Sequence, residues 1–253
     1  MHSLRSMAIS SSCPDSSESL LARCAARPLM LSALHAHGIE IQEDAGALAS
    51  LCRACGLEPN VLLAEVDAAE HRLTEPWRAQ PLPALIEHVL LAYHQPFAAE
   101  LDRLDAALLA ARQASAPQAL EELRALLAEL RAELLEHLAK EEQVLFPWIL
   151  APAPAAAARA IRAMQLEHED TVTLLHTLHG AAVRAFAGSP SDPQVATAQR
   201  ALAQFERWLC EHLHLEDHLL FARARVRARL APRLALDRAA RRTWCGRCKD
   251  ARS

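Results

Sequence analysis

The chain has 253 residues, of which 52% are apolar and 23% charged, and its formal net charge is −4. This composition excludes a disordered chain and provides enough residues for a sizeable core. Only 6 glycines occur, and Ala, Leu, Glu and Arg dominate. Because these are strong helix formers, and the residues typical of strands are few, the composition predicts an all-α protein.

The charge is unevenly distributed along the chain. From Arg223 to Ser253 there are 11 Lys or Arg residues and 2 Asp, whereas the preceding residues are acidic. This basic segment could touch nucleic acid or an anionic surface. A solvated, Arg-rich helix end is the simpler interpretation, so no nucleic acid partner is expected.

The N-terminus and the apolar runs predict a cytoplasmic protein. Residues 1–21 are rich in serine and lack the apolar region of a secretory signal. No uninterrupted apolar run approaches the roughly 18 to 20 residues of a membrane span, so no membrane contact is expected. In a reducing compartment the 7 cysteines should be thiols or ligands; they are Cys13, Cys24, Cys52, Cys55, Cys210, Cys245 and Cys248.

Helix-breaking residues divide the chain into five segments. Residues 1–25 are predicted to be a disordered tail. Residues 26–72 are predicted to be a small domain of short helices, which stop at Gly38 and Gly56 and start again at Pro59. Residues 73–81 are predicted to be a proline-rich linker, 82–224 a helical bundle, and 225–253 a basic C-terminal arm with a Cys-x-x-Cys motif.

Four long helices are predicted in the bundle, from Leu82 to Arg112, Pro117 to about Pro147, Ala156 to Ala187, and Gln194 to at least Phe221. Short connections between helices of this length imply an up-down-up-down four-helix bundle. Pro96 is expected to kink the first helix, and Ser115 to cap the second.

The motif His-x-x-x-Glu occurs twice, in "HLAKEEQVLF" (137–146) and in "HLHLEDHLLF" (212–221). Both copies fall on the apolar stripe of their helix, where positions three and four apart share one face. The stripe of the second helix is Leu120, Leu123, Leu127, Leu130, Leu134, His137, Glu141, Val144 and Trp148. His94 and His168 lie on the stripes of the first and third helices, so the bundle core is expected to hold four His and two Glu.

Six core residues are therefore candidate metal ligands: His94, His137, Glu141, His168, His212 and Glu216. A single core His is usually satisfied by a hydrogen bond, but buried carboxylates need a positive partner, and no Lys or Arg lies on these stripes nearby. Four nitrogens and two carboxylates suit two metal ions, each held by two His and bridged by both Glu. Because no sulfur ligand is present, iron or manganese is favoured over structural zinc.

These stretches carry a family resemblance. Residues 82–224 resemble a hemerythrin-like (HHE) cation-binding domain, and residues 26–224 resemble the di-iron proteins for repair of iron centres (the RIC family). The matching pieces are "EPWRAQPL", "EHVLLAYH", "EHLAKEEQVLFP", "LEHED" and "EHLHLEDHLLF". The resemblance implies two non-heme iron ions with carboxylate or oxo bridges, held by the six residues above. His88 matches a further family histidine and is interpreted as a supporting group rather than a ligand.

The N-terminal region departs from the family pattern. The family has two adjacent cysteines after a Gly-Ile-Asp-aromatic step, whereas residues 38–46 here read "GIEIQEDAG". Two Cys-x-x-Cys pairs occur elsewhere, Cys52/Cys55 and Cys245/Cys248. Their plain interpretations are a small core residue for Cys52 and a solvated tail for "CGRC". We nevertheless predict that "CGRC", in Arg-rich surroundings, is a redox or metal-transfer element that replaces the missing pair.

The resemblance implies a protein that repairs or protects iron centres under nitrosative or oxidative stress. Its expected partners are NO or O₂, a client iron–sulfur protein and a second copy of the chain in a homodimer. An alternative is an O₂- or NO-binding or sensing module without repair activity, which the missing cysteine pair favours. The retained two-domain layout favours repair. A dinuclear hydrolase is a weaker third hypothesis, since no nucleophile motif such as G-x-S-x-G occurs.

Overall fold

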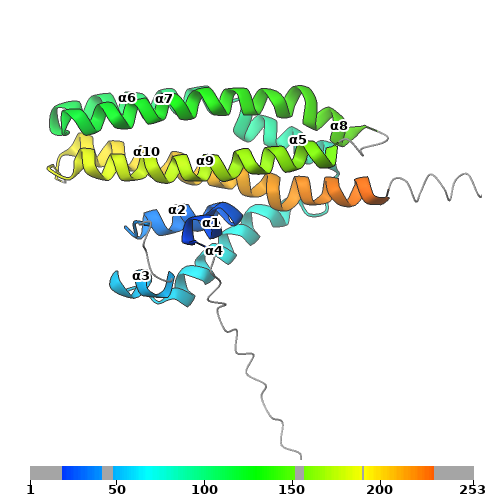
Figure 1. The fold of residues 1–253 in the computed structure, drawn as a ribbon, viewed down its shortest axis with the longest axis horizontal. Coiled ribbons are helices and arrows are strands. Elements are labelled where there is room, and N and C mark those ends of the chain that lie inside the picture. The colour runs from blue at the N-terminus through cyan, green and yellow to red at the C-terminus, as the bar shows by residue number, and fades with distance from the viewer. Residues whose placement is uncertain (1–18, 42–47, 152–156, 190, 231–253) are drawn as a thin grey trace, which may run out of the picture.

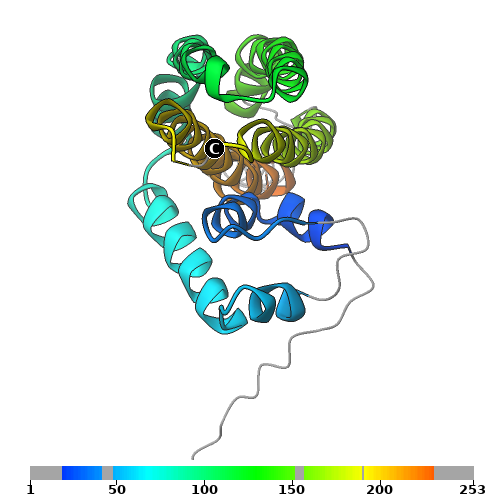
Figure 2. The same cartoon turned by 90° about the vertical axis from the view of Figure 1, so that its left-hand side faces the viewer.

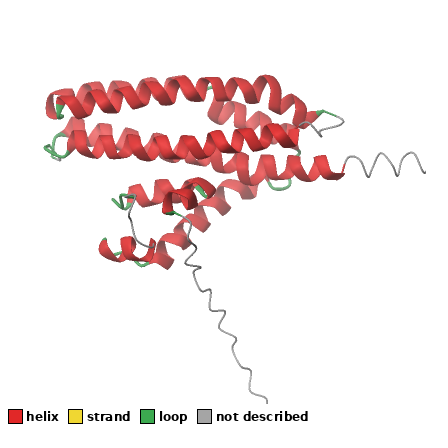
Figure 3. Ribbon diagram, viewed as in Figure 1, coloured by secondary structure: helices red, strands yellow, loops and turns green. Residues whose placement is uncertain are grey.

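The computed structural model describes residues 19–41, 48–151, 157–189 and 191–230. Every regular element within these ranges is a helix (Figure 3), which confirms the all-α prediction. None of the described helices is long and apolar enough to cross a membrane. Most of the predicted N-terminal tail, the "CGRC" motif and the basic arm after Leu230 lie outside the described residues.

Four long helices form an up-down-up-down bundle (Figure 1). The first consists of α5 (Leu82–Val89), η2 (Leu90–His94), α6 (Phe97–Ala110) and η3 (Ala111–Ala114). The second consists of α7 (Pro117–Lys140), η4 (Glu141–Leu145) and α8 (Phe146–Leu150). The third is α9 (Ala157–Phe186), and the fourth consists of α10 (Pro193–Leu215), η6 (Glu216–Leu220) and the helical residues 221–230.

Local chemistry explains where these helices begin. Proline occupies the first turn of α7 and of α10, where its missing N–H removes no helical hydrogen bond. The Asp192 carboxylate caps α10 by accepting hydrogen bonds from the backbone N–H groups of Gln194 and Val195. The prediction that Ser115 caps the second helix is wrong. Its hydroxyl donates back to the carbonyl of Ala111 at 2.6 Å and so closes the preceding helix instead.

Three of the long helices contain a π-helical turn, in η2, η4 and η6. In each turn an N–H bonds five residues back, as from Gln95 to Leu90 at 2.9 Å. A π turn adds one residue and rotates the face that follows it. The predicted stripe of the second helix is therefore wrong beyond Glu141. Val144 and Trp148 are 39% and 43% exposed, and the buried side chains are Leu145, Phe146 and Ile149.

The bundle core is divided into two apolar clusters. One includes Leu134, Val172 and Leu209 and extends to the N-terminal helices. The other includes Phe146 and Phe221 and lies at the end of the bundle formed by α5, α8 and η6. Each of the four long helices also contributes a buried histidine, and two of them contribute a buried glutamate; these six side chains form the layer described in the next section.

The N-terminal helices are α1 (Leu20–Ala26), α2 (Pro28–Ala36), α3 (Leu48–Ala54) and α4 (Pro59–Thr74). Gly38 and Gly56 have φ values of +68° and +72°, which L side chains rarely adopt, and they end α2 and α3 as predicted. The predicted disordered tail is wrong for residues 20–25. The Ser19 hydroxyl caps α1, and Leu20 and Cys24 are buried in the core.

Helices α1 and α2 pack on the face of the bundle formed by α9 and α10, and α4 also contacts α10 (Figure 2). The Arg27 side chain, between α1 and α2, donates to Glu70 at 2.9 and 2.7 Å and to Asp67 at 2.5 Å, both on α4. The predicted linker includes η1 (Glu75–Trp77), whose Trp77 ring stacks on His88 at 4.0 Å. The N-terminal helices thus pack on the bundle through α1, α2 and α4.

Candidate metal centre

The six predicted ligands meet in one buried layer of the bundle. His94 ends η2, His137 lies in the last turn of α7, and His168 lies on α9. His212 lies near the end of α10, and Glu141 and Glu216 are the first residues of η4 and η6. None of the six is more than 6% exposed. Each π turn therefore begins or ends at a residue of this layer, and such turns are frequent at functional sites.

The imidazoles form two pairs. Nε2 of His94 lies 3.2 Å from Nε2 of His212, and Nε2 of His137 lies 3.0 Å from Nε2 of His168. The donor atoms of each pair and of both glutamates lie within 4.8 Å of one another, so each set could hold a metal ion. Two neighbouring nitrogens bound at about 2.1 Å to one octahedral ion are separated by roughly 3 Å, which matches both pairs.

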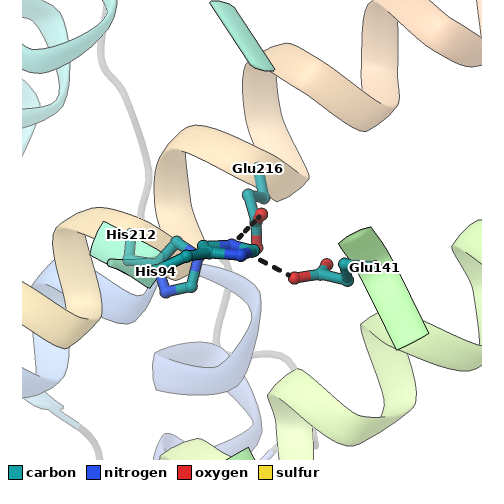
Figure 4. A group of neighbouring side chains, drawn as sticks. All are labelled: His94, Glu141, His212 and Glu216. Carbon is teal, nitrogen blue, oxygen red and sulfur yellow. Dashed lines mark hydrogen bonds and ion pairs between the residues drawn. The ribbon is translucent and has the colours of Figure 1, made fainter. Parts of the chain in front are cut away.

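Both glutamates are shared between the two pairs. Glu141 Oε2 lies 3.5 Å from Nε2 of both His94 and His137. The Glu216 carboxylate lies 3.2 Å from His212 and 3.6 Å from His94 (Figure 4). It also lies 3.4 Å from His168. All four carboxylate oxygens are buried without a hydrogen-bond partner among the described residues, and no described Lys or Arg is buried. Burying such carboxylate oxygens lowers the stability of the fold unless a cation compensates their charge.

The pKa values of the two carboxyl groups are shifted in opposite directions. Burial, and then the charge of Glu216, raise the pKa of Glu141 well above its usual range. Burial opposes ionisation of Glu216, but the neighbouring His212 imidazole holds its pKa well below the usual range. Burial also lowers the pKa of His137 to about 4, so this imidazole is neutral at pH 7. A neutral imidazole is the form that binds a metal ion.

Three carboxylates that the sequence prediction did not select contact the Nδ1 atoms of three of these histidines. Nδ1–H of His94 donates to Glu142 at 3.0 Å, and Nδ1–H of His137 donates to Glu167 at 2.9 Å. Nδ1 of His168 lies 3.1 Å from Asp217. Carboxylates in this position fix the tautomer and the ring orientation of metal-binding histidines. Each one directly precedes or follows a predicted ligand in the sequence, and this adjacency is the sequence signal that could have identified it.

The tautomers that Glu142 and Glu167 favour in His94 and His137 suit a metal ion in the layer. Once Nδ1 of His94 and of His137 carries the proton, their Nε2 atoms present lone pairs to the interior. These lone pairs face a second imidazole nitrogen and carboxylate oxygens, which is repulsive unless a cation lies between them. The donor set contains only nitrogen and oxygen, as octahedral iron and manganese sites do.

His212 is supported by a column of aromatic rings instead of a carboxylate. Tyr93 stacks on His212 with ring centres 5.1 Å apart, and His88 meets the edge of Tyr93 at 5.9 Å. Trp77 stacks on His88 with ring centres 4.0 Å apart. His88 does not belong to either metal-binding set, and burial lowers its pKa.

Comparison with known proteins points to one family. The family model "Hemerythrin HHE cation binding domain" matches residues 85–224. The chain is 35% identical to the iron-sulfur cluster repair protein DnrN of Neisseria gonorrhoeae, over 58% of this chain and 94% of that protein. It is 30% and 32% identical to the iron-sulfur cluster repair proteins YtfE of Escherichia coli O81 (strain ED1a) and Cronobacter sakazakii (strain ATCC BAA-894), in each case over 71% of this chain and 84% of the relative.

Proposed function

Because the chain belongs to the hemerythrin HHE cation-binding family, we propose that it is a non-heme di-iron protein that repairs iron–sulfur clusters. The observation that carries the proposal is the buried layer of four imidazoles around two shared carboxylates, whose oxygens have no hydrogen-bond partner in the part of the chain that the structure describes. The two YtfE relatives, whose names specify cluster repair, are matched by this chain over 84% of their own length.

In this proposal His94 and His212 hold one iron, and His137 and His168 hold the other. Glu141 and Glu216 each reach both pairs, so they serve as bridges that set the spacing of the two ions. Glu142, Glu167 and Asp217 hold the imidazoles in the orientation that presents Nε2 to the centre. The bound iron pair would supply redox chemistry and a place for NO or O₂, or iron for a client protein.

The direct test is recovery of a damaged cluster. An iron–sulfur enzyme whose cluster has been destroyed by NO is incubated with the iron-loaded chain, and its activity is followed over time. We expect recovery with the wild type and with Glu169→Gln, an exposed neighbour on α9. We expect none with His168→Ala, which removes a proposed ligand.

Two outcomes would contradict repair. Recovery that free ferrous ion reproduces at the same concentration would show that the chain contributes nothing beyond its iron. Reversible spectral changes with O₂ or NO, together with no recovery of the client, would instead support a binding or sensing module.

A further inference from the structure

A second group of buried donors lies where the N-terminal helices meet the bundle. It consists of His35 on α2, His179 on α9 and Glu206 on α10. His35 and Glu206 are 7% and 1% exposed, and the His179 side chain is 17% exposed. His179 follows His168 by three helical turns, or roughly 16 Å along α9. The group is therefore separate from the layer at the di-iron position.

The donor atoms are spaced as they would be around one ion. Nδ1 of His179 lies 2.9 and 3.2 Å from the two oxygens of Glu206, and Nδ1 of His35 lies 3.3 Å from Oε2. Donors on a tetrahedral ion with bonds of about 2.0 to 2.1 Å are separated by roughly 3.3 Å. The His35 and His179 rings stack with centres 3.7 Å apart, and both direct Nδ1 at the same carboxylate.

A third histidine determines which nitrogen of His35 is free for a metal. Nε2–H of His176 donates to the carbonyl of Ile41 at 2.8 Å, so Nδ1 of a neutral His176 carries a lone pair. Burial lowers the pKa of His176, which favours this neutral form. The lone pair faces Nε2 of His35 at 3.3 Å, so that nitrogen of His35 must be the donor.

The remaining nitrogen of His35 has two alternatives. Without a metal, Nδ1 of a neutral His35 would direct a lone pair at Oε2 of Glu206, so this contact would need an additional proton between the two atoms. With a metal, Nδ1 of a neutral His35 binds the ion. The hydrogen bonds from His35 to His176 and from His176 to Ile41 are both kept. A metal-binding histidine that donates its other N–H to an acceptor is the usual arrangement.

Glu206 supplies the negative charge that such a site requires. Burial opposes its ionisation, but hydrogen bonds from His179 and His35 lower its pKa. His176 and His179 also line a cavity of about 520 Å³, together with Thr173, Thr177, Gly180 and Ile41. Of the three donors, His179 borders this cavity, so water or another small ligand can approach the site from that side.

We propose that His35, His179 and Glu206 form a mononuclear site for a divalent transition metal ion, distinct from the centre in the bundle. Two imidazoles and one carboxylate with open positions suit Fe²⁺ or Zn²⁺. Because the ligands come from α2, α9 and α10, a bound ion would fasten the N-terminal helices to the bundle.

The test is a Co²⁺ titration of the full chain while iron (the bundle iron) occupies the layer of His94, His137, Glu141, His168, His212 and Glu216. Bound Co²⁺ absorbs visible light, and the spectrum reports its coordination geometry. We expect one Co²⁺ per chain. His35→Asn and His179→Asn should abolish its binding, because the Asn amide can still donate to Glu206 but is a poor ligand. His176→Ala should weaken binding about 10- to 100-fold. His71→Asn, an exposed histidine on α4, is the matched control and should bind Co²⁺ normally.

Iron content and the melting temperature of each variant are measured on the same samples, so loss of the fold or of the bundle iron is detected separately. No Co²⁺ bound at roughly 100 times the protein concentration would overturn the proposal and leave His35 and Glu206 as a buried hydrogen-bonded pair. Binding that survives His179→Asn, or that appears only as iron is lost, would overturn it as well. Failure of the repair assay would not affect this result.

Discussion

The Nδ1–H group of His137 donates to Oε2 of Glu167 at 2.9 Å, while Nζ of Lys140 donates to the other oxygen of the same carboxylate at 3.0 Å. The bond from His137 has the largest effect on the pKa of Glu167, burial opposes it, and the bond from Lys140 adds to it; together they lower this pKa to about 2. Glu167 is therefore an anion at neutral pH. It holds His137 in the tautomer whose Nε2 lone pair faces the proposed di-iron centre.

Replacing Glu167 with Gln should weaken iron binding about 10- to 100-fold, because the neutral amide no longer fixes the His137 tautomer or raises its basicity. Competition with a chelator measures the change. Glu169→Gln is the control, since Glu169 lies on the exposed side of α9 near Arg162. Equal affinities for the two variants would show that the contact with His137 does not support the metal.

Replacing Glu141 with Gln should have opposite effects with and without metal. In the metal-free chain the buried Glu141 carboxylate has no hydrogen-bond partner among the described residues, so Glu141→Gln should stabilise the fold at pH 7 by about 1 to 3 kcal/mol. The same change should remove most of the stabilisation that iron provides. Glu133→Gln, on the exposed face of α7, should do neither.

The pH dependence of this effect has a definite sign. Burial raises the folded-state pKa of Glu141, so the metal-free wild type is favoured below about pH 4.5 and loses stability as pH rises through the folded pKa. The advantage of Glu141→Gln over the wild type should therefore grow with pH. Chemical denaturation at several pH values checks this, and an advantage that shrinks as pH rises would be inconsistent with a raised pKa.

The π turn at η4 predicts which neighbouring side chain matters for stability. Ile149 is fully buried, whereas Trp148 is 43% exposed. Ile149→Ala should lower the free energy of unfolding by about 2 to 5 kcal/mol, and Trp148→Ala by less than about 1 kcal/mol. Urea unfolding of the two variants measures both values. A larger loss for Trp148→Ala would mean that the helix keeps its α register through Glu141.

The described cysteines should differ sharply in reactivity. Burial raises the pKa of Cys24 to about 12 and that of Cys210 well above its usual range, whereas Cys55 is exposed. Alkylation of the native protein at pH 8, followed by peptide mass spectrometry, should modify Cys55 first and leave Cys24 and Cys210 intact. Cys52 is fully buried and should also be spared. Rapid labelling of Cys24 would show that α1 detaches from the bundle.

The apolar periodicity predicted much of the fold. It placed His137 and Glu141, and likewise His212 and Glu216, on one helical stripe, and the structure brings these residues together. The stripe failed after Glu141 because a π turn adds a residue, and no single residue in "EEQVLF" encodes that turn. Residues 20–25 were assigned to the disordered tail because the serines before them dominated that stretch, although Leu20 and Cys24 are spaced as core residues.

Contacts between distant segments were harder to predict. His35, His179 and Glu206 have no shared local motif, and only the packing of α2 on α9 and α10 brings them together. A partial signal existed, since His176 and His179 are three residues apart on one helical face. Their partners on α2 and α10 could not be identified without the tertiary structure.

The iron content of the purified full chain tests the central claim most directly. Chains expressed in iron-replete medium are analysed for metals, and optical spectra are recorded reduced, in air and with NO. The paired imidazoles and shared carboxylates predict about two irons held in the bundle of each chain. The His94→Ala/His168→Ala variant should lose both irons and the associated absorption. Iron near zero with stoichiometric zinc in the wild type, or iron that this double variant retains, would contradict a di-iron centre at these residues.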